Sequence, residues 1–120
     1  MCSDRLRGRL IRSAGQAPVC PAKHALTDAV ALVNRNLVGA THIELYLVEF
    51  KPGGEGLDDA HPGCEHGFFV LSGKGEFYVE GERFELGAED CLFIPEGARH
   101  SVKTLGDQPL RTVVFMAPHR

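Results

Sequence analysis

Four side chains of types that bind metal ions lie in two short stretches of this sequence. Asp59, His61 and His66 precede an apolar segment, and His100 follows the turn at 95–97. Asp59 and His61 are two residues apart, so an extended chain would point both side chains in one direction. Three imidazoles and one carboxylate suit a divalent first-row metal such as Mn, Fe, Ni, Cu or Zn. We therefore predict a metal site formed by these four residues, catalytic in type if one coordination position is left for solvent or substrate.

Two charged residues beside the predicted ligands are candidates for catalysis. Glu65 precedes His66, and alternation along a strand would place the two side chains on opposite faces. A bulge would exchange them, which makes Glu65 both the alternative carboxylate ligand and a candidate outer partner or proton carrier. Arg99 precedes His100, and its guanidinium could hold a substrate carboxylate. A solvent-exposed position would leave either residue without a role.

A third candidate, Tyr46, shares one face of an expected strand with His42 and Glu44. If that face lined a barrel, these side chains could bind polar substrate groups, and Tyr46 with Glu44 could serve a sugar isomerase or epimerase. We expect the face to point to solvent, because the opposite face of the strand is apolar. His24 and His119 lie outside both ligand stretches and are expected at the surface.

The pattern around the ligand stretches predicts short β-strands. Residues 41–50 alternate apolar and polar side chains with the period of two that a half-buried strand shows. The Pro52-Gly53-Gly54 sequence is expected to end this strand, and Gly81 is expected to supply a positive φ in a hairpin. Strands are predicted at 41–50, 67–72, 76–80, 82–86, 91–94, 100–104 and 110–116. Short strands at this spacing indicate an all-β sandwich or barrel.

Residues 1–40 carry the weakest pattern of the chain. The segment 26–37 fits a short helix or a pair of irregular strands equally well. We predict that residues 1–40 form an N-terminal extension packed on the barrel or on a partner, and that residues 41–118 form one barrel domain. A chain of 120 residues leaves no room for two domains, since one domain typically takes about 100–150 residues.

The spacing of these residues resembles the two motifs of the cupin superfamily. With Gly73 as the closing glycine of the first motif, His66 takes the place of the family's glutamate. His61 and Asp59 then take the places of its two histidines. In the second motif, the Pro95-x-Gly97-x-x-His100 element matches fully. The resemblance implies a double-stranded β-helix, or jelly-roll barrel, with a metal in its mouth.

The order of the ligands, carboxylate-x-His followed by a later His-Gly, is similar to that of the ureidoglycine aminohydrolase branch of the cupins. That branch uses manganese and releases ammonia from a small ureido acid. The resemblance implies hydrolase or lyase chemistry on a polar carboxylate or ureido metabolite, with a divalent cation (Mn, Fe, Zn or Ni) as Lewis acid. The same ligands with iron would support a dioxygenase. Thr104 replaces the family's terminal asparagine, which is compatible with a non-catalytic cupin that binds a small ligand.

Composition argues against several other classes of protein. A formal charge of −3 is unsuited to a general binder of nucleic acid or of anionic membranes. The apolar runs are far shorter than the roughly 20 residues of a membrane span. The four cysteines form no Cys-x-x-Cys pair, and the N-terminus lacks a secretory signal, so we expect free thiols and a cytoplasmic location. The expected partners are a small-molecule substrate and a second copy of the chain in a homodimer.

Overall fold

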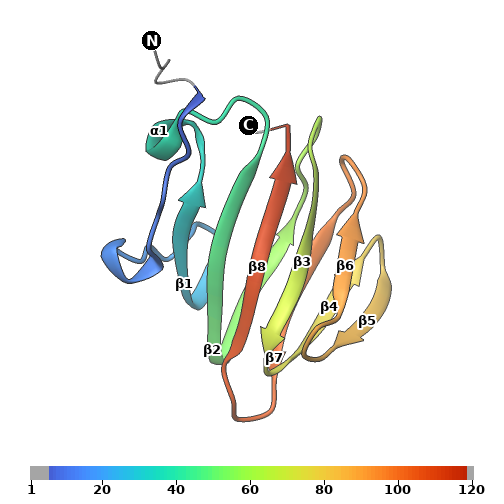
Figure 1. The fold of residues 1–120 in the computed structure, drawn as a ribbon. Helices are drawn as coiled ribbons and strands as arrows, with labels where there is room; N and C mark the ends of the chain where they lie inside the picture. The colour runs from blue at the N-terminus through green and yellow to red at the C-terminus, as the bar shows by residue number, and fades with distance from the viewer. Residues whose placement is uncertain (1–5, 119–120) are drawn as a thin grey trace.

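The computed structural model describes residues 6–118, and for Asp58 only the backbone. Strands dominate this range, and Figure 1 shows them rolled into one barrel-like body. Helical structure is limited to short turns, which include η2 (Ser13–Gly15) and α1 (Arg35–Val38). The predicted all-β jelly-roll class is confirmed. The strands are β1 (His24–Val33), β2 (Glu44–Asp59), β3 (Glu65–Ser72), β4 (Lys74–Val79), β5 (Glu82–Leu86), β6 (Cys91–Ile94), β7 (His100–Leu105) and β8 (Leu110–Ala117).

One long strand, β2, joins the two halves of the barrel. The strands are hydrogen-bonded in the order β5-β4-β7-β2-β8-β3-β6, and β1 pairs with β2 outside this path. Residues 44–50 of β2 pair antiparallel with β8, whereas residues 55–59 pair antiparallel with β7. Because one strand belongs to both halves, the sheet rolls around and brings β3 opposite β7.

The prediction that the Pro52-Gly53-Gly54 sequence ends this strand is wrong. β2 continues to Asp59, and the Pro-Gly-Gly segment is the place where it bends from one half of the barrel to the other. At the bend the backbones pack closely: a Cβ on Gly54 would lie 2.8 Å from the carbonyl oxygen of Lys51 and 2.9 Å from that of Leu26. The glycines therefore permit a bulged corner rather than a chain reversal.

The prediction that Glu44 and Tyr46 point to solvent is also wrong. Val48 and Phe50 point into the barrel with 5% and 0% exposure, and Glu44, on the same face, is only 9% exposed. Tyr46 packs against this core, whereas Ile43 on the opposite face is 54% exposed. Both faces of the strand carry apolar residues, so alternation alone did not identify the inner one. Glu44 and Tyr46, predicted to meet solvent, therefore face the inside of the barrel, whereas His42, which precedes β2, is exposed.

Aromatic and aliphatic side chains from both halves fill the barrel. Phe50, Phe77 and Leu110 have exposures of only 0%, 1% and 0%. Burial of a side chain of this size contributes about 1.5–3 kcal/mol to stability. The Phe68 and Phe77 rings lie 5.0 Å apart, and the Phe68 and His66 rings lie 6.1 Å apart in an edge-on contact. The aromatic core therefore contacts His66, one of the predicted metal ligands.

The described part of the N-terminal region is joined to the barrel by β1. This strand pairs with β2 along its length, and Val19 forms a bridge to Ala29 on its other edge. A single helical turn follows, in which the side chain of Asn34 accepts a hydrogen bond from the Leu37 N–H. The segment left open between helix and strands is therefore mostly strand. No helix among residues 6–118 is long and apolar enough to cross a membrane.

Candidate metal centre

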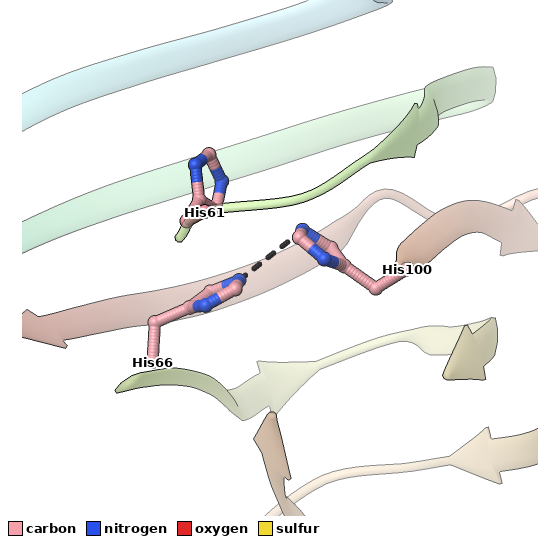
Figure 2. A group of neighbouring side chains, drawn as sticks. All are labelled: His61, His66 and His100. Atoms are coloured by element: carbon pink, nitrogen blue, oxygen red, sulfur yellow. Dashed lines mark hydrogen bonds between the residues drawn. The ribbon is translucent and has the colours of Figure 1, made fainter. Parts of the chain in front are cut away.

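Three of the four predicted ligands converge inside the barrel mouth. His66 lies on β3, His100 begins β7, and His61 lies in the loop between β2 and β3. One ring nitrogen of each lies within 4.8 Å of those of the other two. Figure 2 shows the rings of His66 and His100 facing each other, with His61 beside them. His66 and His100 are buried, at 3% and 8% exposure, so their ring positions are fixed by packing.

The geometry of this cluster fits a bound transition metal. The Nε2 atoms of His66 and His100 are 3.2 Å apart. Metal–nitrogen bonds of about 2.0–2.1 Å place two neighbouring ligands at about 3.0–3.4 Å, so these rings need little movement to share an ion. The Nδ1 atom of His100 lies 3.2 Å from the Ala98 carbonyl oxygen. An Nδ1–H that donates to this carbonyl leaves Nε2 with the free electron pair that a metal requires.

Backbone hydrogen bonds hold the two ligand segments together. The carbonyl oxygen of His61 accepts N–H bonds from Cys64 and from Gly97, each at 3.3 Å. The first closes the loop that carries His61, and the second ties that loop to the turn before His100. The Pro-x-Gly-x-x-His spacing therefore positions two ligands at once. Glu80 supports the same segment, because its carboxylate accepts the Arg99 N–H at 2.6 Å.

Asp59 lies at the rim of the cluster. Its Oδ2 atom is 3.9 Å from the Nε2 atom of His61. Its Oδ1 atom accepts the Ala60 N–H at 2.8 Å and pairs with the Lys23 ammonium at 3.4 Å. Burial favours a higher pKa for Asp59, but the Ala60 N–H, His61 and Lys23 outweigh it and hold the pKa below its usual value. Asp59 is thus an ionised neighbour of His61, and its direct ligation of a metal stays a prediction.

The histidine cluster opens into a cavity of about 360 Å³. Most of its wall is apolar and comes from Phe50, Phe68, Val102, Val114 and Met116. None of the described lysine or arginine side chains lines it. A volume near the lower end of the roughly 300–1,000 Å³ typical of ligand pockets fits a molecule of one or two rings.

Of the three residues predicted to act in catalysis, one lines the cavity and two do not. Tyr46 lines the cavity, and its hydroxyl donates a hydrogen bond to the buried carboxylate of Glu44. Burial, followed by Glu44, raises the pKa of Tyr46 to about 12. Glu65 is exposed while His66 is buried, as strand alternation predicts, and neither Glu65 nor Arg99 is among the described residues that line the cavity. Only Tyr46 of the three is therefore in a position to contact a ligand there.

His24 also lines the cavity, although no sequence pattern identifies it as a cavity residue. The sequence predicts it at the surface, yet it is half-buried and lines the cavity. Its Nδ1 atom is buried without a hydrogen-bond partner among the described residues, and burial lowers its pKa. A bulge between Ala25 and Thr27 interrupts the period of two just after His24. Because of this interruption, the alternation of apolar and polar residues does not show that His24 faces the cavity. His119, the other histidine expected at the surface, lies outside the described residues.

The fold and the cluster together define the class of protein. A rolled antiparallel barrel whose two motifs bring three histidines into its mouth has the architecture of a cupin. Residues 46–116 match the cupin domain family, and this chain belongs to that family.

Two of the relatives are named as polyketide synthase proteins. The chain is 30% identical over 115 residues to the polyketide synthase CurC of Streptomyces cyaneus, covering 96% of this chain and 73% of CurC. It is 29% identical over 100 residues to the tetracenomycin polyketide synthase protein TcmJ of Streptomyces glaucescens, covering 83% of this chain and 67% of TcmJ.

Solved structures share the fold. The polyketide cyclase RemF of Streptomyces resistomycificus superimposes with a TM-score of 0.81 at 23% identity, covering 93% of this chain and 80% of RemF. A predicted oxalate decarboxylase of Thermotoga maritima superimposes with a TM-score of 0.82 at 18% identity, covering 92% of this chain and all of that chain. At these identities the likeness supports the barrel architecture alone.

Proposed function

We propose that this cupin is a metal-dependent enzyme whose substrate is an apolar, ring-containing compound with carbonyl or enol oxygens, of the kind assembled as polyketides. One observation carries the proposal: three convergent imidazoles open into a cavity with apolar walls. The names of CurC and TcmJ, both polyketide synthase proteins, support the same substrate class.

The cavity walls favour this substrate over the small polar metabolite expected from the sequence. A carboxylate or ureido group is costly to bury unless charged or hydrogen-bonding groups surround it. Away from the histidines and Tyr46, the walls formed by Phe50, Phe68 and Val114 offer no such groups, and none of the described lysine or arginine side chains lines the cavity. Burial of apolar rings against these walls would instead contribute to binding. Hydrolase or lyase chemistry on a polar metabolite is therefore the less favoured form of the proposal.

The chain's own residues can bind, orient and move protons for such a substrate. A divalent cation held by His61, His66 and His100 would supply Lewis-acid polarisation of a substrate carbonyl oxygen. The aromatic walls exclude water from the bound ring. Tyr46 is protonated at neutral pH, and its raised pKa favours that form further. Its oxygen can accept the proton lost from the carbon next to a substrate carbonyl while its own proton passes to Glu44, so the pair is suited to enolisation, with the charge developing on the carbonyl oxygen.

Metal content combined with ligand binding tests the proposal. We expect the purified protein to hold near-stoichiometric metal, and we expect the aryl diketone benzoylacetone to bind as its enol only when metal is present. Absorbance of the bound enol reports this binding. His66→Ala and His100→Ala should lose both metal and enol binding, whereas His42→Ala, at an exposed position, should keep both.

Two outcomes would replace the proposal with its alternatives. Tight diketone binding that is unchanged in the absence of metal would identify a non-catalytic ligand-binding cupin. Stoichiometric iron together with oxygen consumption in the presence of the diketone would identify a dioxygenase.

A further inference from the structure

The ring of His24 is held rigidly at the wall of the cavity. It stacks on Phe50 with ring centroids 5.8 Å apart and an interplanar angle of 28°. Its backbone is fixed on both sides, because the His24 N–H donates to the Pro21 carbonyl and the Leu57 N–H donates to the Lys23 carbonyl. A ring restrained in this way can present one edge to a ligand at little entropic cost.

Gly56 makes the space that this ring occupies. Gly56 is the strand partner of His24 in the β1–β2 pairing. A Cβ atom at position 56 would lie 2.8 Å from Cε1 and 3.1 Å from Nδ1 of His24. Any larger residue at position 56 would therefore push the imidazole out of its present position.

The surroundings of Nδ1 disfavour the charged form of His24. Nδ1 is sealed from solvent and has no hydrogen-bond partner among the described residues. An imidazolium would carry a charge and an unsatisfied Nδ1–H at this buried position, and an unsatisfied buried donor alone costs about 1–3 kcal/mol. The neutral imidazole is therefore favoured, and Nε2, which is not among the sealed atoms, is the ring nitrogen that can meet a ligand. Burial, the main cause of the lowered pKa of His24, acts in the same direction.

We propose that His24 is a second anchor for the substrate, whose Nε2–H donates a hydrogen bond to a substrate oxygen other than the one at the histidine cluster. The inference rests on the proposed function and refines its substrate class. The ligand is a ring compound that carries at least two oxygen functions, one for the cluster and one for His24, with apolar surface between them.

Matched ligands and variants test this role. The probes are benzoylacetone and its 3′-hydroxy and 4′-hydroxy derivatives, and the measured quantity is the dissociation constant of each with metal-loaded protein. We expect wild type to bind one hydroxylated probe about fivefold more tightly than benzoylacetone, as one net hydrogen bond predicts. His24→Phe, which keeps an aromatic ring against Phe50, should lose this preference. His24→Asn keeps a side-chain donor and should retain part of the preference.

Gly56→Ala supplies a variant in which the imidazole is present but displaced. It should lose the preference for the hydroxylated probe as His24→Phe does. His42→Phe, at an exposed position, should behave as wild type. If His24→Phe weakens all three probes equally, His24 is a packing residue and the inference is overturned.

A spectroscopic measurement on metal-free protein is independent of activity. Nitrogen-15 NMR of histidine side chains should show His24 as the neutral tautomer with its proton on Nε2. An Nδ1–H tautomer or an imidazolium at neutral pH would contradict the inference. If wild type binds none of the probes in a metal-dependent way, the proposed function itself fails, whatever the tautomer of His24.

Discussion

The Nε2 atoms of His66 and His100 lie 3.2 Å apart across the barrel, although their strands, β3 and β7, are not neighbours in the sheet. The contact exists only because β2 carries the sheet from one half of the barrel to the other. Metal binding should therefore report on closure of the barrel, and closure should be favoured by metal.

Metal is expected to stabilise the fold through this pair. A ligand that binds only the folded state adds about 2.7 kcal/mol to the free energy of unfolding at 100 times its dissociation constant. Adding Zn²⁺ should raise the melting temperature of wild type and of His42→Ala, and should leave that of His66→Ala unchanged. Calorimetry with and without metal measures the difference. An equal rise in all three proteins would mean that Zn²⁺ binds elsewhere.

Glu80 is expected to support metal binding from outside the cluster. Its carboxylate accepts the Arg99 N–H at 2.6 Å, and its own N–H donates to the Arg99 carbonyl at 2.8 Å, next to His100. Loss of an outer partner of this kind typically weakens metal affinity by about 10–100-fold. Glu80→Ala should fall near the lower end of that range in a calorimetric titration with Zn²⁺. Glu82→Ala, on the same hairpin, is the control, and equal affinities for the two variants would contradict the role of Glu80.

Tyr46 should make stability sensitive to alkaline pH. Burial and then Glu44 raise its pKa to about 12, above the value of about 10 in an unfolded chain. The folded protein therefore holds this proton more tightly, and its contribution to stability is complete below pH 10 and is lost as the pH rises toward 12. Denaturant unfolding between pH 9 and pH 12 should show this loss in wild type and not in Tyr46→Phe. Tyrosinate absorbance provides a second check, because a Tyr46 that ionises near pH 10 would rule out this explanation.

Two glycines with the same backbone angle should respond differently to alanine. Gly73 has φ +82° and Gly81 has φ +83°. A Cβ on Gly73 would lie 2.2 Å from the Pro109 carbonyl oxygen, whereas nothing lies within 4 Å of one on Gly81. Gly81→Ala should cost about 1–2 kcal/mol from the left-handed backbone alone. Gly73→Ala should cost about 1–3 kcal/mol more because of the overlap. Urea unfolding measures the difference in the free energy of unfolding between the two variants. Similar values would show that the Gly73 turn relaxes to accommodate the added methyl group.

The sequence by itself determined the fold class and three of the cavity histidines. Alternating apolar residues and glycine or proline turns are local features, and they indicate strands whatever the partners of those strands are. The spacing within the two motifs is local as well. It places His66 and His100 at the starts of strands and His61 in the loop before β3, where the jelly roll brings them together.

Only the tertiary structure decided which side of β2 faces inward and what lies beside the cluster. Both faces of that strand carry apolar residues, so the inner one depends on how β7, β8 and β1 wrap around it. The Pro52-Gly53-Gly54 segment is a corner and not an end because both flanking parts find strand partners. The place of His24 depends on its pairing with Gly56, a contact between distant parts of the chain that no local pattern encodes.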